Sequence, residues 1–144
     1  MFAADGPSAF RVLVADDNDD NQRVLVHILE SLGVHADAAA SGRQALNMLM
    51  RTGYDLVLMD SRMPEMDGVT ATAEIRRTEP PAHRTPIVAM VEGISSEDHV
   101  RLVESGTDDV LLKPVPRMAL QSVLRKWLPV AGWSTGGEQV RQSL

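Results

Sequence analysis

The sequence predicts an α/β domain with a five-stranded, doubly wound parallel sheet and five helices. Two observations support this prediction. Five short apolar runs alternate with five amphipathic stretches, and three of the runs are almost uninterrupted by polar residues. Uninterrupted apolar runs are typical of strands that helices cover on both faces. Strict alternation of strands and helices favours right-handed crossovers and helices on both faces of one sheet.

The expected strands come at regular intervals along the chain. They are Arg11–Ala15, Val34–Ala38, Asp55–Met59, Pro86–Met90 and Asp108–Leu112. At this chain length, five strand–helix units leave no room for a second large domain.

The expected helices differ in how clearly the sequence marks them. An apolar stripe runs through Asp20–Leu32, which ends at Gly33, and another runs through Pro116–Leu128. Ser41 is a suitable N-cap for a helix that ends near Met50. The helices near 67–77 and 95–105 are inferred partly from their positions between strands.

Composition excludes several classes of function. The 144 residues carry a formal net charge of −6, and Trp, Tyr and Phe number 2, 1 and 2, which argues against a nucleic-acid-binding surface. The absence of cysteine excludes disulfides, thiolate zinc sites and cysteine nucleophiles. No apolar run approaches the roughly 18 residues of a membrane span. We expect a cytoplasmic domain over 11–128, an N-terminal extension over 1–10 and a C-terminal tail or linker over 129–144.

Charged residues follow four of the five expected strands. Asp16 and Asp17 follow the first strand, Asp60 the third, Glu92 the fourth and Lys113 the fifth. A single aspartate after a strand is more often a turn or cap residue than a functional one. However, the carboxyl ends of parallel strands meet at one edge of the sheet, so these charges are expected to converge there.

Such a cluster of charges predicts a particular chemistry. Neighbouring carboxylates repel one another, and Mg²⁺ is the hard cation that best suits an oxygen site with open positions. The sequence has no glycine-rich phosphate loop, so nucleotide binding is poorly supported. Carboxylates, a metal and a lysine fit an aspartyl phosphate, in which the cation and the ammonium stabilise phosphoryl transfer.

Three motifs resemble those of one protein family. They are Val-Leu-Val-Ala-Asp16-Asp17-Asn18, Leu-Met59-Asp60-Ser-Arg-Met63-Pro64-Glu-Met-Asp67-Gly68 and Lys113-Pro114-Val115, with Gly106-Thr-Asp-Asp109 before the last strand. Over about 11–128, the sequence is similar to receiver (response-regulator) domains of two-component signalling, most like those of hybrid sensor histidine kinases. The resemblance implies a flavodoxin-like sheet with strand order 2-1-3-4-5.

The resemblance also implies roles for the residues at the sheet edge. Asp60 would accept a phosphoryl group from a phosphohistidine on a histidine kinase or phosphotransfer protein. Asp17, Asp60 and the main-chain carbonyl of Arg62 would hold Mg²⁺, and Asp16 would assist through water. Lys113 would pair with the phosphoryl oxygens, and the Lys–Pro bond that follows it would be cis. The domain would be a phosphoryl acceptor, not an enzyme in its own right, whether it stands alone or belongs to a hybrid kinase.

Three positions depart from the family pattern. Relatives normally carry Thr or Ser where this chain has Val91, a small residue where it has Glu92, and Tyr or Phe where it has Val110. The missing hydroxyl and aromatic ring predict phosphorylation with a muted structural switch. Glu92 is expected to lie at the mouth of the site and to repel an incoming phosphoryl group.

Two other interpretations remain. A degenerate receiver could serve as a protein-interaction module without phosphorylation, which Val91, Glu92 and Val110 favour and the intact acidic residues and lysine oppose. A metal-dependent phosphotransferase or phosphatase would need a second acid–base aspartate two residues after its nucleophile, where this chain has Arg62.

Overall fold

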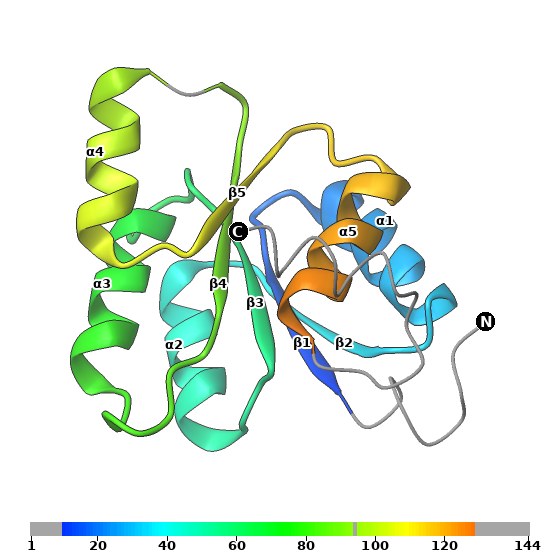
Figure 1. Ribbon diagram of the computed structural model, residues 1–144, viewed down its shortest axis with the longest axis horizontal. Helices are drawn as coiled ribbons and strands as arrows, with labels where there is room; N and C mark the ends of the chain where they lie inside the picture. Colours follow the sequence, from blue (N-terminus) through cyan, green and yellow to red (C-terminus); the bar gives the residue numbers. More distant parts are fainter. Residues whose placement is uncertain (1–9, 94, 129–144) are drawn as a thin grey trace.

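Residues 10–93 and 95–128 are described by the computed structural model, and their strands and helices alternate along the chain (Figure 1). The elements are β1 (Arg11–Ala15), α1 (Asp19–Ser31), β2 (His35–Ala39), α2 (Gly42–Arg51), β3 (Leu56–Asp60), α3 (Gly68–Thr78), β4 (Ile87–Val91), α4 (Ser96–Ser105), β5 (Asp109–Leu112) and α5 (Arg117–Trp127). The predicted N-terminal extension, apart from Phe10, and the predicted C-terminal tail lie outside these residues.

The five strands form one parallel sheet in the order β2-β1-β3-β4-β5, which confirms the predicted topology. Helices α1 and α5 cover one face of the sheet, and α2, α3 and α4 cover the other (Figure 1). All five strands therefore end at the same edge, and the residues that follow them are brought together there.

The element boundaries differ from the predicted ones by no more than one residue. The second strand begins at His35 instead of Val34, because Gly33 has a positive φ of 96° and the Val34 N–H donates to the Leu29 carbonyl at the end of α1. The last helix begins at Arg117, with Pro116 as its N-cap. Shifts of this size are usual where a helix or strand frays into a turn.

The core consists of apolar layers on both faces of the sheet. In β1, Val12 and Val14 pack in the layer under α1 and α5, whereas Leu13 and Ala15 pack in the layer under α2 and α3. All four are fully buried. Burial on both faces explains why the strand sequences are continuously apolar instead of alternating.

Polar caps set where several helices begin. Asn18 caps α1 by accepting the Asn21 N–H, and Ser41 caps α2 as predicted. Asp67 caps α3 by accepting the Thr70 N–H at 2.8 Å, and Ser95 begins α4 within a capping box. Because three of these caps follow β1, β3 and β4, they also help to shape the loops at the carboxyl edge of the sheet.

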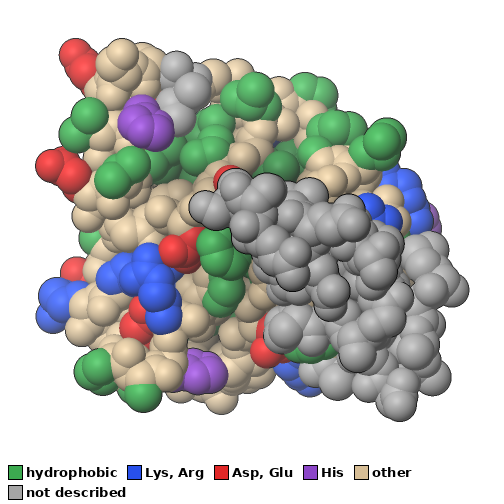
Figure 2. Space-filling model, in the orientation of Figure 1, with side chains coloured by type: hydrophobic (Ala, Val, Ile, Leu, Met, Phe, Trp, Pro, Cys, Tyr) green, Lys and Arg blue, Asp and Glu red, His purple; other side chains and the backbone are tan. Residues whose placement is uncertain are grey.

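A second polar cluster, which no sequence pattern predicted, lies at the opposite edge of the sheet. The guanidinium of Arg76 donates to the carbonyls of Gly106 and Thr85 and pairs with Glu79 and with Asp108, the latter at 2.6 Å. Figure 2 shows basic and acidic side chains next to each other on this part of the surface. The cluster links α3 to the segments that precede β4 and β5.

None of the helices in the described ranges has the length and apolar character to cross a membrane.

We predict that Gly68→Ala destabilises the fold. Gly68 begins α3, and a Cβ there would overlap the main-chain carbonyl of Asp60, which no side-chain rotation can relieve. The free energy of unfolding should fall by about 1–3 kcal/mol, measured by urea denaturation. Gly53→Ala is the control, because a Cβ at Gly53 meets no atom within 4 Å. Equal stability of the two variants would contradict the close packing of α3 against Asp60.

Candidate functional site

The structure brings the predicted charged residues together at the carboxyl edge of the sheet. Asp16 and Asp17 follow β1, Asp60 is the last residue of β3, and Lys113 follows β5. Asp16 and Asp60 are 0% and 4% exposed, whereas Asp17 is exposed. The peptide bond between Lys113 and Pro114 is cis, as the family resemblance implied.

Lys113 is the cation that contacts the two buried carboxylates. Its Nζ lies 3.1 Å from Asp60 Oδ1 and 3.6 Å from Asp16 Oδ2. Main-chain donors add to this, because Asp60 Oδ1 accepts the Arg62 N–H at 3.2 Å and Asp16 Oδ1 accepts the Asn18 N–H at 2.9 Å. Among the described residues, the buried Asp16 Oδ2 has no hydrogen-bond partner.

The carboxylates have an arrangement that fits a hard divalent cation. Each of Asp16, Asp17 and Asp60 offers a carboxylate oxygen, and these three atoms lie within 4.8 Å of one another. Three carboxylates beside one ammonium leave an excess of negative charge, and Asp16 Oδ2 lacks a hydrogen-bond donor. An all-oxygen donor set of this kind suits Mg²⁺, which keeps several waters and shares its coordination shell with phosphate oxygens.

Burial changes the acidity of the central pair. It raises the pKa of the Asp60 carboxyl above its usual value, and the neighbouring charge of Asp16 raises it further, against the opposing effects of Lys113 and the Arg62 N–H. For Lys113, burial favours the neutral amine, but the hydrogen bond and charge of Asp60 and the charge of Asp16 outweigh it and raise the pKa. The Lys113 amine is therefore stabilised in its protonated form, whereas burial and the charge of Asp16 destabilise the ionised form of Asp60.

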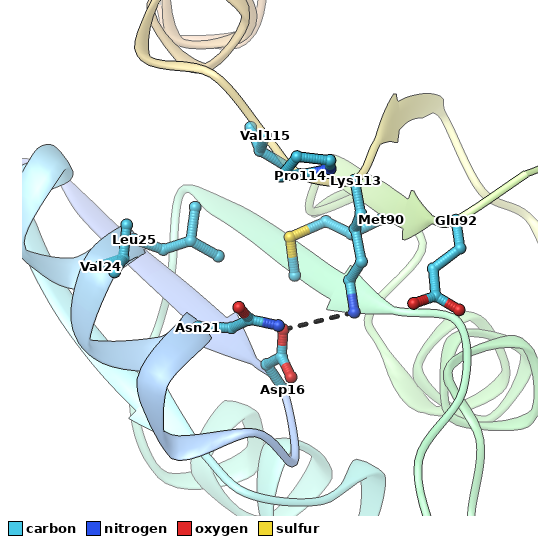
Figure 3. Close-up of a pocket in the computed structure, with 9 residues that line it drawn as sticks. All are labelled: Asp16, Asn21, Val24, Leu25, Met90, Glu92, Lys113, Pro114 and Val115. Atoms are coloured by element: carbon cyan, nitrogen blue, oxygen red, sulfur yellow. Dashed lines mark ion pairs between the residues drawn. The ribbon is translucent and has the colours of Figure 1, made fainter.

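Two adjoining cavities open beside these residues. The smaller, of about 200 Å³, is lined by Asp16, Asp17, Asn18, Asn21, Asp60, Ser61, Arg62, Glu92 and Lys113. The larger, of about 530 Å³, has a more apolar wall formed by Val24, Leu25, Met90, Pro114 and Val115 (Figure 3). The two cavities share Asp16, Asn21, Glu92 and Lys113, so an acidic cleft adjoins an apolar groove along α1 and the loop that follows β5.

The two atypical valines lie in apolar surroundings. Val91 is 3% exposed and packs in a small cluster with Ala89 and Leu102, and the partly buried Val110 and Val69 pack against it. This cluster lies between the sheet and the pair α3 and α4. Both valines therefore pack in the core, and neither side chain supplies a hydrogen-bond donor there.

Sequence reasoning missed several residues that shape the site. Asn21 and Ser61 line the smaller cavity, and the Gln22 side-chain amide donates to the carbonyls of Asp16 and Ala39. The helical spacing of Asn21 and Gln22 just after the acidic pair could have placed them near the site. Nothing in the local sequence indicates that Gly68 must approach the Asp60 carbonyl.

Comparison with known proteins identifies relatives across nearly the whole of the described chain. The family model for the response regulator receiver domain matches residues 12–125. The sensor histidine kinase GacS of Pseudomonas protegens is 37% identical over 134 residues, which is 92% of this chain. The chain spans only 15% of the length of that kinase.

Solved structures show the same fold. The receiver domain of sensor histidine kinase PA1611 from Pseudomonas aeruginosa, with a magnesium ion in its active-site cleft, gives a TM-score of 0.75 at 38% identity and covers 82% of this chain and 96% of that one. A co-crystal structure of the Saccharomyces cerevisiae phosphotransfer protein Ypd1 with the receiver domain of Ssk1 also matches. Its TM-score is 0.75 at 28% identity, covering 82% of this chain and 88% of the matched chain.

We predict that Mg²⁺ stabilises the protein through this acidic cluster. At a concentration ten times the dissociation constant, the free energy of unfolding should rise by about 1.4 kcal/mol, because Mg²⁺ binds the folded state selectively. Asp60→Asn should lose most of that gain, and without Mg²⁺ it should be at least as stable as the wild type, because a buried charge beside Asp16 has been removed. Urea denaturation with and without MgCl₂, with NaCl at matched ionic strength as control, measures both effects. Equal Mg²⁺ stabilisation of the two proteins would contradict this assignment.

Proposed function

We propose that this chain, which belongs to the response regulator receiver domain family of two-component signalling, accepts a phosphoryl group on Asp60 from a phosphohistidine. The observation that carries the proposal is the position of Lys113. Its Nζ lies 3.1 Å from Asp60 Oδ1, at a cavity that Asp16 and Asp17 also line. A nucleophilic carboxylate, a fixed ammonium and an acidic metal site are thus combined at one sheet edge.

The transfer is an exchange of one bond to phosphorus for another. A carboxylate oxygen of Asp60 attacks the phosphorus, the bond between phosphorus and the imidazole nitrogen breaks, and the imidazole leaves with the electron pair and takes up a proton. The product is an aspartyl phosphate. Asp60 Oδ1 already accepts the Arg62 N–H and forms an ion pair with Lys113, and these two contacts hold the carboxylate in one orientation.

Asp16, Asp17 and Asp60 would hold Mg²⁺, together with the main-chain carbonyl of Arg62. When bound, the ion neutralises charge on the phosphoryl oxygens and on the carboxylates during the transfer. The excess of negative charge in the cleft and the unpartnered Asp16 Oδ2 support this role. Asp16 is fully buried and so contributes a fixed charge, whereas the exposed Asp17 is open to solvent and metal.

Lys113 would stabilise the phosphoryl group after transfer. In the unphosphorylated protein its ammonium lies between the carboxylates of Asp60 and Asp16. Phosphorylation places additional oxygens with negative charge at Asp60, within reach of the same ammonium. The raised pKa of Lys113 keeps it charged at neutral pH, as this role requires.

The donor would be a protein that carries the phosphohistidine, either a histidine kinase or a phosphotransfer protein. The larger cavity gives such a partner an apolar groove beside the acidic cleft. Val24 and Met118 are 56% and 79% exposed, and they add apolar surface on α1 and α5. The Ssk1 receiver domain, which is similar to this chain, was crystallised with the phosphotransfer protein Ypd1.

We expect phosphoryl transfer to depend on Asp60. The chain is incubated with Mg²⁺ and a histidine kinase domain labelled on its histidine, and label is followed by gel electrophoresis. The wild type should be labelled, and Asp60→Asn should not, because an amide cannot form the acyl phosphate. Label on neither protein would instead favour the alternative of a degenerate receiver that acts as a phosphorylation-independent interaction module, and label on both would contradict the assignment of Asp60 as the acceptor.

Val91 and Val110 give that alternative its specific support, and they also shape the primary proposal. Both side chains pack in an apolar cluster. Val91 lacks the hydroxyl, and Val110 the aromatic ring, that the family pattern has at these positions. We propose that phosphorylation takes place with a muted structural response around α4 and β5.

We predict that Val91→Thr tightens the binding of beryllofluoride, a phosphoryl mimic, in the presence of Mg²⁺. The affinity should increase about tenfold, because the new hydroxyl can donate one hydrogen bond to a charged group. Affinity is measured by titration followed by NMR, and the variant should also show larger shifts in α4 and β5 than the wild type. Unchanged affinity, or equally large shifts already in the wild type, would contradict the muted switch.

A further inference from the structure

Glu92 occupies a position between the two cavities. It follows β4, its side chain is exposed, and it lines both the acidic cleft and the apolar groove. Figure 3 shows its carboxylate pointing into the shared space, with the Lys113 ammonium between it and Asp16. Among the described residues, Lys113 has ion-pair partners in Asp16 and Asp60 but not in Glu92.

Among the described residues, no ion pair therefore engages the Glu92 carboxylate at the entrance to the site. A divalent cation and Lys113 together balance the three carboxylates of the cluster. Glu92 adds a fourth carboxylate where an incoming phosphoryl group must pass, and among the described residues no ion pair joins it to Arg62, the other cation that lines the acidic cleft. Arg62 lines the acidic cleft but not the apolar groove, whereas Glu92 lines both.

We propose that Glu92 is a specificity-determining residue that slows phosphorylation of Asp60 by small, freely diffusing anionic phosphodonors. The inference rests on the proposed function of Asp60. A free donor meets the full repulsion of Glu92 as it enters the cleft. A phosphohistidine on a protein is held at the cleft by contacts along the apolar groove, and the free energy of those contacts offsets the repulsion.

Two small donors of different charge make this discrimination measurable. Acetyl phosphate is a dianion at neutral pH and phosphoramidate a monoanion. In both reactions an Asp60 oxygen attacks phosphorus. The phosphorus–oxygen bond to acetate breaks in the first, and the phosphorus–nitrogen bond breaks in the second, where ammonia leaves with a proton. The product at Asp60 is the same, so only the charge and leaving group of the donor differ.

The test compares second-order rate constants of phosphorylation in saturating Mg²⁺, followed by intact-protein mass spectrometry. We expect Glu92→Gln to raise the rate with acetyl phosphate about three- to tenfold, because it removes one negative charge whose repulsion of the donor is partly screened by solvent. The rise with phosphoramidate should be smaller. Glu92→Lys should raise the acetyl phosphate rate further. Glu104→Gln, which removes an exposed carboxylate at the far end of α4, is the matched control and should leave both rates unchanged.

The outcomes separate this inference from the proposed function. If the wild type gains a phosphoryl group that Asp60→Asn does not, the proposed function holds whatever Glu92 does. Unchanged acetyl phosphate rates in Glu92→Gln and Glu92→Lys, or equal increases with the two donors, would then overturn the role of Glu92 alone. Failure of every protein, including the Glu92 variants, to gain a phosphoryl group at Asp60 would overturn both proposals.

Discussion

The arrangement of the site depends on two carboxylates that are buried beside a single ammonium. Asp16 and Asp60 are almost fully covered, and Lys113 Nζ contacts both of them. Burial disfavours ionisation and raises the pKa of Asp60, and the charge of Asp16 raises it further, so a bound cation would stabilise the ionised cluster. The parallel sheet makes this arrangement possible, because its strands end at one edge although their residues are far apart in sequence.

The sequence predicted the fold and the charged cluster because both follow from strong local patterns. Apolar runs indicated the strands, and the charged residues that follow them converge once all strands are parallel. The sequence did not predict contacts that depend on how the elements pack in three dimensions. The Arg76 cluster joins residues up to 32 positions apart, and the approach of Gly68 to the Asp60 carbonyl follows from how α3 packs. The one-residue shift of β2 reflects the turn at Gly33 after α1.

Two of the three departures from the family pattern, Val91 and Glu92, lie at the end of β4. Val91 is turned into an apolar cluster and Glu92 into the entrance of the site. The two neighbours act on different properties: the valine removes a hydrogen-bond donor from the expected switch, and the glutamate adds charge on the path of the donor. We propose that together they mark a receiver domain that keeps the residues for phosphoryl acceptance but differs in its structural response and in its choice of donor.

The central claim is that Asp60 becomes an aspartyl phosphate. It is tested most directly by treating the protein with phosphoramidate and Mg²⁺, reducing the product with borohydride and locating the modified residue by tandem mass spectrometry. We predict one modified residue, Asp60, and loss of the phosphoryl group on treatment with hydroxylamine, which cleaves acyl phosphates. Modification at another residue, or none at Asp60 under conditions where Mg²⁺ is bound, would contradict it.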